Sequence, residues 1–256
     1  MSRCIALIQA RMSSSRFPGK VLEPIGRIPL VVFMVNRVRR ARLIGEVVVV
    51  TSCDVSDDPL VKTLAKHDVP CFRGDLHDVL RRYAQAAHAH SATEVVRLTG
   101  DCPLIDPMVI DDVIDARRAT DSHYAANIDP PTFPDGLDCE VFQSETLHEA
   151  DRRAHLLPER EHVTLWMRRD DIGLRRTNVR AIADCSHLRL TIDYPDDLAV
   201  VRRIVEVLGS TPDDFDWFDV LRVLSTEPTL VRANQHERNE GLALSLAHES
   251  SKNVKL

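Results

Sequence analysis

The sequence lacks the long apolar stretches of a membrane protein and the opening of a secreted one. No apolar run approaches the roughly 18 residues that a membrane span requires, so we expect no transmembrane segment. The first ten residues, MSRCIALIQA, have neither the length nor the small-residue cleavage site of a signal peptide. The sequence therefore predicts a cytoplasmic protein whose N-terminus enters the fold directly.

Cysteine spacing and net charge exclude further classes of protein. The chain has six cysteines and no CxxC pair, so it offers neither a zinc site nor a disulfide framework, and buried free thiols are expected. The formal net charge is −6 and the sequence pI is about 6.0. This balance provides no electrostatic footprint for nucleic acid, so any functional cations must act locally.

The first stretch with a distinctive pattern runs from Ile5 to Leu22. An apolar segment, typical of a buried strand, ends at Gln9 and is followed by small and basic residues. Three serines and Pro18-Gly19 disfavour a helix, leaving a loop with exposed N–H groups, hydroxyls, Arg16 and Lys20. Such a loop suits a polyphosphate. It matches neither a Walker loop nor a GxGxxG fingerprint, and an ordinary surface loop with solvated charges explains it equally well.

Strand and helix patterns alternate through the first half of the chain. This order predicts an α/β fold with a mostly parallel sheet covered on both faces, in which ligands bind beyond the carboxyl ends of the strands. Strands are expected at 5–8, 46–51, 70–72, 94–99, 137–142, 172–179 and 188–192. Helices are expected at 29–42, 57–67, 75–90, 106–119, 145–154, 160–168, 195–208 and 215–224.

The chain is most economically one domain with a short appendage. Its 44% hydrophobic and 28% charged residues are typical of a globular protein with a sizeable core. No repeat, low-complexity tract or linker divides it. We expect a catalytic domain over residues 1–225 and a C-terminal appendage over 226–256, whose polar part from Glu240 onward is loosely held.

Two aspartates stand at the ends of predicted strands. Asp101 follows the strand at 94–99, and Asp193 follows the one at 188–192. Carboxylates placed there can hold a divalent cation beside bound phosphates, although a cap on the following turn explains Asp101 alone slightly better. Together with Arg16 and Lys20, they supply the minimum set of groups for nucleotidyl or phosphoryl transfer.

Further polar residues are candidates for binding a second substrate. Arg73 precedes a helix whose start Asp75 can cap, which leaves the arginine without a structural role. Asp138 and Glu140 alternate along a predicted strand, where they offer acceptors to the hydroxyls of a polyol or form a solvated face. His162 binds substrate or is simply structural. No nucleophile elbow accompanies the Ser, Cys and His residues, so a catalytic triad ranks low.

Six sequence blocks, in this order, closely resemble the SpsF group of cytidylyltransferases. The blocks are QARMSSSRFPGKVL, FRGDLHDVLRRY, RLTGDCPLIDP, FPDGLDCEVF, REHVT and LTIDYPDDL. This group is the spore coat polysaccharide branch of a family that includes the synthetases of CMP-activated acylneuraminate and 3-deoxy-manno-octulosonate. The resemblance spans Ile5 to Leu198 and resumes at RNEGLALSL near the C-terminus.

The resemblance implies a fold, a reaction and a set of site residues. The fold is that of the nucleotide-diphospho-sugar transferases, a Rossmann-like α/β/α sandwich. The substrates are CTP and a small anionic acceptor, and the cofactor is Mg²⁺. Apart from the resemblance, a homodimer is among the expected assemblies. Arg16, Lys20 and Asp101 would be catalytic, and Asp101 and Asp193 would bind the metal. The residues expected to bind nucleotide are Gln9, Ala10, Arg11, Ser13, Ser14, Arg16, Lys20, Thr99 and Gly100. Those expected to bind the acceptor are Arg73, Asp138, Glu140 and His162.

The chain also departs from its relatives, and these departures bear on the acceptor. Many relatives carry Gly where this chain has Ser13, and Leu where it has Phe17. The sequence GDCP around Asp101 differs from the GDEP of the octulosonate enzymes. We expect transfer of CMP to an anionic acceptor, most simply a sugar acid, for a surface glycan. The alternatives are a phosphonate or other non-sugar anion as acceptor, a glycosyltransferase that uses a nucleotide sugar, and a non-catalytic nucleotide-binding module.

Overall fold

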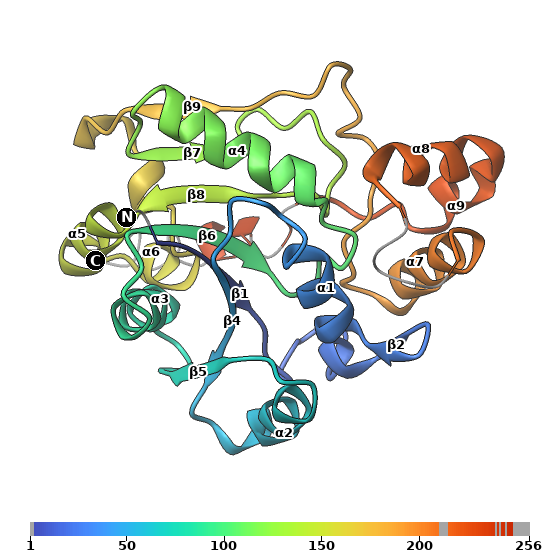
Figure 1. Ribbon diagram of the computed structural model, residues 1–256, viewed down its shortest axis with the longest axis horizontal. Helices are drawn as coiled ribbons and strands as arrows, with labels where there is room; N and C mark the ends of the chain where they lie inside the picture. The colour runs from blue at the N-terminus through green and yellow to red at the C-terminus, as the bar shows by residue number, and fades with distance from the viewer. Residues whose placement is uncertain (1–2, 210–214, 239, 241, 244, 248–256) are drawn as a thin grey trace.

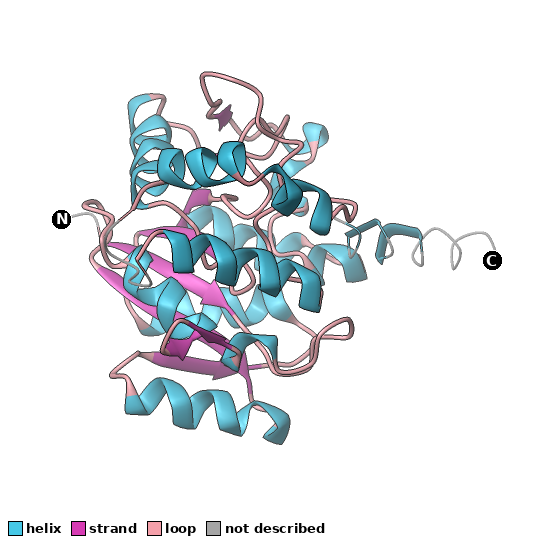
Figure 2. Cartoon of the chain, turned by 90° about the vertical axis from the view of Figure 1, so that its right-hand side faces the viewer, coloured by secondary structure: helices cyan, strands magenta, loops and turns pink. Residues whose placement is uncertain are grey.

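The computed structural model describes residues 3–209, 215–238, 240, 242–243 and 245–247, and it has three layers. A seven-stranded sheet of order β5-β4-β1-β6-β8-β7-β9 lies between two layers of helices (Figures 1 and 2). Strands β5, β4, β1 and β6 are parallel, and β8 is antiparallel to both of its neighbours. The mostly parallel sheet predicted from the sequence is confirmed. The strands are β1 Cys4–Gln9, β4 Glu46–Ser52, β5 Cys71–Gly74, β6 Glu94–Thr99, β7 Tyr124–Ala126, β8 Glu140–Gln143 and β9 Arg176–Asn178.

Helices α1 to α9 flank the sheet or extend it at one side. Helices α1, α2 and α4 cover one face of the sheet, and α3 and α5 cover the other. The helices are α1 Leu30–Val38, α2 Asp58–Lys66, α3 Val79–Ala89, α4 Pro107–Ala119, α5 Ser144–Arg153, α6 Leu157–Glu161, α7 Pro195–Val207, α8 Trp217–Thr226 and α9 Pro228–Ala233. A small hairpin, β2 Pro24–Ile25 and β3 Ile28–Pro29, precedes α1. None of the described helices is both long and apolar enough to cross a bilayer.

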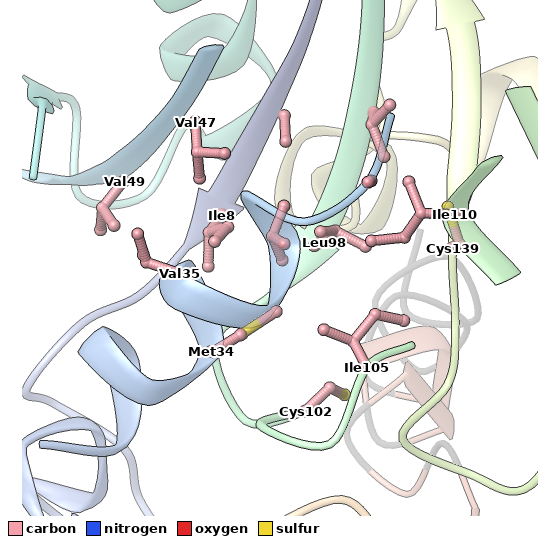
Figure 3. Close-up of a cluster of buried hydrophobic side chains, with 14 of the residues drawn as sticks. Ile8, Met34, Val35, Val47, Val49, Leu98, Cys102, Ile105, Ile110 and Cys139 are labelled. Atoms are coloured by element: carbon pink, nitrogen blue, oxygen red, sulfur yellow. The ribbon is translucent and has the colours of Figure 1, made fainter. Parts of the chain in front are cut away.

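The core is built by the alternation of side chains along the central strands. In β1, Ala6 and Ile8 pack toward α1 and α4, and Ile5 and Leu7 pack toward α3. Successive residues of a strand point to opposite faces, so a wholly apolar strand stabilises both layers at once. Figure 3 shows the first cluster, in which Ile8 lies among side chains from α1, β4 and β6.

All six cysteines are free thiols, as expected, but they are not all buried. Cys4, Cys102 and Cys139 are buried, whereas Cys53 is exposed and Cys71 and Cys185 are half-buried. Figure 3 shows Cys102 and Cys139 within the first cluster, where they pack as small apolar side chains.

Helices α7, α8 and α9 form a further apolar cluster beside the sheet. Leu198 and Ile204 of α7 pack with Val220 of α8 and with Leu30 of α1, and Leu230 of α9 packs against the same cluster. Residues 226–238 therefore continue the fold where the sequence suggested an appendage. The domain boundary at residue 225 stays a prediction.

Two of the predicted elements do not form as expected. Residues 160–168 do not form one helix, because α6 ends at Glu161 and Val163 takes a positive φ of 56°, which a β-branched residue rarely adopts. Residues 188–192 are extended but form no ladder. Their N–H and C=O groups instead bond to the loops around Asp135 and Asp101, including Ile192 N to Asp101 O at 2.8 Å.

The loop after β1 is held to the sheet by Asp57. This buried carboxylate accepts hydrogen bonds from the Met12 N–H at 2.7 Å, the Thr51 hydroxyl at 2.9 Å and the N–H and hydroxyl of Ser52. Burial favours the neutral acid, but these donors outweigh it and lower the pKa of Asp57. The sequence suggested only that Asp57 opens a helix. The structure shows that it also joins β4 to the loop that carries Arg16 and Lys20.

We predict that Asp57→Asn lowers the free energy of unfolding by about 2–3 kcal/mol at pH 7, because an amide meets donors that need a charged acceptor. The pKa of Asp57 is lower in the folded state than in the unfolded state. Its contribution is therefore present above pH ~4 and is lost as pH falls through the folded pKa. Denaturant titrations between pH 3 and pH 8 test this. Asp68→Asn, at an exposed position, is the control. An equal effect of both substitutions would contradict the role of Asp57.

Candidate active site

Two adjoining cavities open beyond the carboxyl ends of β1 and β6, where a parallel sheet is expected to bind its ligands. The first cavity, of about 380 Å³, is lined by the loop after β1 and has the size of a ligand pocket. The second, of about 210 Å³, lies toward Asp138 and the segment 188–193. Six residues line both cavities: Arg16, Arg97, Thr99, Asp101, His162 and Asp193.

The Lys20 ammonium joins the two aspartates that the sequence placed at strand ends. Its Nζ lies 3.2 Å from Asp101 Oδ2 and 2.9 Å from Asp193 Oδ1, and it donates a hydrogen bond of 2.6 Å to Ile192 O. The lysine is buried, with 6% of its surface exposed. The structure therefore brings together the loop lysine and both aspartates that the sequence suggested.

Burial and mutual attraction act in opposite directions on these charges. Burial alone would lower the pKa of Lys20, but Asp101 and Asp193 raise it above its usual value. Burial would also raise the pKa of Asp193, yet Lys20 and Arg16 lower it to about 2. Asp101 likewise has a lowered pKa, because Lys20 outweighs its burial. All three groups therefore stay ionised at neutral pH.

Arg16 forms the second cationic contact to Asp193. Its Nη2 lies 2.7 Å from Asp193 Oδ1, and its guanidinium stands 5.5 Å from the ring centroid of Tyr194. Its Nη1 lies 3.5 Å from Glu240 Oε2, which also accepts a hydrogen bond of 2.9 Å from the Tyr194 hydroxyl. Arg16 is therefore bound on one side by the site and on the other by the C-terminal segment.

The tail from Glu240 onward, which the sequence suggested is loosely held, makes specific contacts at the residues that the structure describes there. Glu240 binds Arg16, Leu242 lines the second cavity, and Ser245 donates a hydrogen bond of 3.0 Å to Glu161. Just before them, Arg238 pairs with Asp138. Charge complementarity brings this polar segment to the site, which composition alone does not reveal. Residues 241, 244 and 248–256 of the predicted tail lie outside the described part.

Gly100 is required by the close approach of the two strand ends. Its N–H donates a hydrogen bond of 2.7 Å to Gln9 O, and a Cβ at this position would lie 2.8 Å from the same oxygen. A side chain would push the Asp101 loop away from the loop after β1. The predicted nucleotide-binding residues Gln9, Thr99 and Gly100 line the first cavity. So do Ala10, Arg11, Ser14, Arg16 and Lys20, whereas Ser13 does not.

The carboxylates of Asp101 and Asp193 fit a divalent metal. Both converge on a single cation, the Lys20 ammonium, and both remain ionised. Mg²⁺ prefers oxygen ligands and is usually held by one or two carboxylates together with substrate phosphates. The donor chemistry therefore matches the predicted metal-binding pair.

Arg73 is the predicted acceptor residue that the structure does not bring to either cavity. Its guanidinium lies 2.8 Å from Asp58 Oδ1 and donates hydrogen bonds to Ser52 O and Asp54 O. Arg73 therefore ties the edge strand β5 to the turn after β4. This use was hidden in the sequence, because the partners of Arg73 lie about 15–21 residues earlier in the chain, on another strand and helix.

The other three predicted acceptor residues, Asp138, Glu140 and His162, line the second cavity. Burial raises the pKa of Asp138 to about 7, although Arg238 opposes the shift. Glu140 is 3% exposed and accepts hydrogen bonds from Tyr124, Thr164 and Arg97. Burial lowers the pKa of His162, and its Nε2 is buried without a hydrogen-bond partner.

Sequence reasoning missed several charged residues of the site. Arg97 lines both cavities, and Asp135, Arg168 and Arg189 line the second. Arg97 carried a usable signal, because alternation along β6 places it on the same face as Thr99. Arg189 contacts Asp135 at 3.1 Å and Asp193 at 3.3 Å, pairings that depend on the unexpected course of residues 188–192.

Comparison with known proteins agrees with this geometry. The family model described as Cytidylyltransferase matches residues 5–206. The spore coat polysaccharide biosynthesis protein SpsF of Bacillus subtilis is 32% identical over 220 residues, covering 83% of this chain and 90% of that protein. The 3-deoxy-manno-octulosonate cytidylyltransferase of Geobacter sulfurreducens is 38% identical over 111 residues, 43% of each chain.

Solved structures show the same architecture. A cytidylyltransferase from Leptospira borgpetersenii superposes with a TM-score of 0.86 at 30% identity, covering 93% of this chain and 100% of that one. CMP:2-keto-3-deoxy-manno-octonic acid synthetase, solved in complex with CTP, superposes with a TM-score of 0.63 at 17% identity and covers 80% and 99% of the two chains. The fold is thus that of the nucleotide-diphospho-sugar transferases, as predicted. Sequence and structure together establish that this chain is an enzyme of the cytidylyltransferase family.

Proposed function

We propose that this enzyme transfers CMP from CTP to an anionic acceptor, most simply a sugar acid, and releases pyrophosphate, as a step in making a surface polysaccharide. The observation that carries the proposal is the pair of adjoining cavities with Arg16, Asp101 and Asp193 on their common boundary. A nucleotide in the first cavity and an acceptor in the second would meet at that boundary. The SpsF and octulosonate relatives support polysaccharide or sugar-acid chemistry.

The loop after β1 would bind the nucleotide through its charges and its backbone. Arg16 and Lys20 neutralise negative charge on the triphosphate, while the N–H groups and hydroxyls of the loop donate hydrogen bonds. Arg16 Nη2 and Lys20 Nζ both contact Asp193 Oδ1, at 2.7 Å and 2.9 Å, so their two charges would act together on the phosphates. The protein thereby contributes mainly the positioning of the reacting groups and the neutralisation of their charge.

In the reaction, an acceptor hydroxyl oxygen forms a bond to the α-phosphorus of CTP with one of its lone pairs. The bond between that phosphorus and the oxygen bridging to the β-phosphorus breaks, and pyrophosphate leaves with the electron pair. The hydroxyl proton passes to water. Asp101 and Asp193 would hold Mg²⁺, which supplies charge neutralisation to the phosphates when bound. Lys20 keeps these two carboxylates together and ionised.

The proposal predicts pyrophosphate release from CTP only in the presence of an acceptor. The protein is incubated with CTP, Mg²⁺ and, in turn, an acylneuraminate, 3-deoxy-manno-octulosonate and a phosphonic acid, and pyrophosphate is measured with a coupled assay. We expect release with at least one carboxylic sugar acid, and replacement of CTP by ATP to abolish it. Turnover of a nucleotide sugar, without release from CTP, would overturn the proposal in favour of a glycosyltransferase.

We predict that Asp101→Asn lowers kcat/KM at least 100-fold, which corresponds to about 2.7 kcal/mol of transition-state stabilisation. The amide keeps the shape of the side chain and a hydrogen-bond acceptor for Lys20, but loses the charge that a metal requires. Asp54→Asn is the matched control, because Asp54 also follows a parallel strand, β4, yet lines neither cavity. Activity of Asp101→Asn near that of the control would show that the carboxylate serves only the local structure.

A further inference from the structure

Arg97 lies on the boundary between the two cavities, and part of its guanidinium has no hydrogen-bond partner. It projects from β6 and lines both cavities, and 14% of its side chain is exposed. Its Nη1 donates to Glu140, and its Nε is buried without a hydrogen-bond partner. Its Nη2 forms no hydrogen bond to any described residue. An arginine nitrogen left free in a cavity is available to a ligand.

Glu140 holds this guanidinium in place. Arg97 and Glu140 are direct cross-strand partners in the antiparallel register of β6 and β8, which explains their pairing. The Glu140 carboxylate also accepts hydrogen bonds of 2.6 Å from the hydroxyls of Tyr124 and Thr164. Although burial opposes the ionised form, Arg97 and these hydroxyls lower the pKa of Glu140. The carboxylate therefore remains charged and its orientation is fixed from three sides.

Arg97 differs from the other groups that line both cavities in its charge and in having a terminal nitrogen without a hydrogen-bond partner. Asp101 and Asp193 are negative, Thr99 is neutral, and burial disfavours the charged form of His162. Arg16 is already bound to Asp193 and Glu240. Both terminal nitrogens of Arg16 thus have carboxylate partners, whereas Nη2 of Arg97 has none among the described residues.

We propose that Arg97 is a catalytic residue that donates a hydrogen bond from Nη2 to the phosphoryl group in transfer, and that Glu140 is its positioning residue. This inference rests on the proposed function, because that function places the α-phosphate of CTP where the two cavities meet. As the acceptor oxygen bonds to phosphorus and pyrophosphate departs with its electron pair, the non-bridging oxygens of the α-phosphate remain anionic. A fixed guanidinium in a poorly solvated site stabilises them without reorganising.

The proposal changes the role expected of Glu140. From the sequence, this residue was expected to bind the acceptor. Its carboxylate already accepts from three side chains, so it acts on the reaction through Arg97. Removing one positioned hydrogen-bond donor to a developing anion typically lowers kcat by about 10²–10³.

Testing the proposal requires a variant that still folds. Arg97→Met alone leaves Glu140 buried and unpaired, which is strongly destabilising. The test variant is therefore the double substitution Arg97→Met with Glu140→Gln, which removes both charges and leaves an amide to meet the hydroxyls of Tyr124 and Thr164. The matched control is Arg117→Met with Glu94→Gln, a second buried pair that involves β6 but lines neither cavity. Thermal melting confirms that both variants are folded.

Two measurements separate a catalytic from a structural role. We expect the test variant to lose about 100-fold or more in kcat for pyrophosphate release, with the Kd for CTP changed less than threefold by calorimetry. In ³¹P NMR spectra of enzyme-bound CTP, the α-phosphorus resonance should move relative to wild type while the γ-phosphorus resonance stays in place. The control should change none of these values. Glu140→Gln alone should lower kcat about tenfold without changing KM for CTP, a split that a loss of stability does not produce.

The possible outcomes are distinguishable. If wild-type protein binds CTP, and the folded test variant keeps both the α-phosphorus resonance and kcat of wild type, the role of Arg97 is overturned while the proposed function survives. If wild-type protein binds no CTP in calorimetry, the proposed function fails, and the role of Arg97 fails with it. A loss of kcat equal in the test and control variants would show that both pairs matter only for the fold.

Discussion

The contact of one buried ammonium with two carboxylates is the constraint on which the site depends. Lys20 comes from the loop after β1, Asp101 from the loop after β6 and Asp193 from the extended segment before α7. Without the lysine, the two half-buried carboxylates would repel each other, and the pKa of at least one would rise. The ammonium therefore keeps three distant segments together and keeps both acids ionised. These are the conditions under which the pair can take a metal and a phosphate.

The sheet explains why these segments meet. Strands β1 and β6 are parallel neighbours, so their carboxyl ends lie at one edge, and Gly100 lets the two loops approach within a backbone hydrogen bond. Strand β8 then enters beside β6 in the opposite direction. Its first residue, Glu140, consequently pairs with Arg97, three residues before Gly100, and not with the far end of β6. One reversal of strand direction thus brings acidic side chains back to the edge where the cations are.

Charge compensation continues outward from this centre to the C-terminus. Arg16 connects Asp193 to Glu240, Arg189 connects Asp193 to Asp135, and Arg238 pairs with Asp138. Each cation is shared between carboxylates from different parts of the chain, or ties a late segment to an early one. A chain with a formal charge of −6 therefore presents its positive groups where anionic substrates are proposed to bind.

Local pattern and composition determined the α/β class, most element positions, the candidate loop with Arg16 and Lys20, and the two candidate aspartates, Asp101 and Asp193. Each of these rests on neighbours in sequence: the alternation of apolar residues, a break at Pro-Gly, or an acid directly after a strand. The ordered family blocks added the nucleotide. Only the tertiary structure decided that Arg73 faces Asp58, that Glu140 faces Arg97 and that Glu240 reaches Arg16. Those pairings depend on strand order, on the antiparallel register of β8 and on the path of residues 188–193. They join residues far apart in sequence, between which no local periodicity exists.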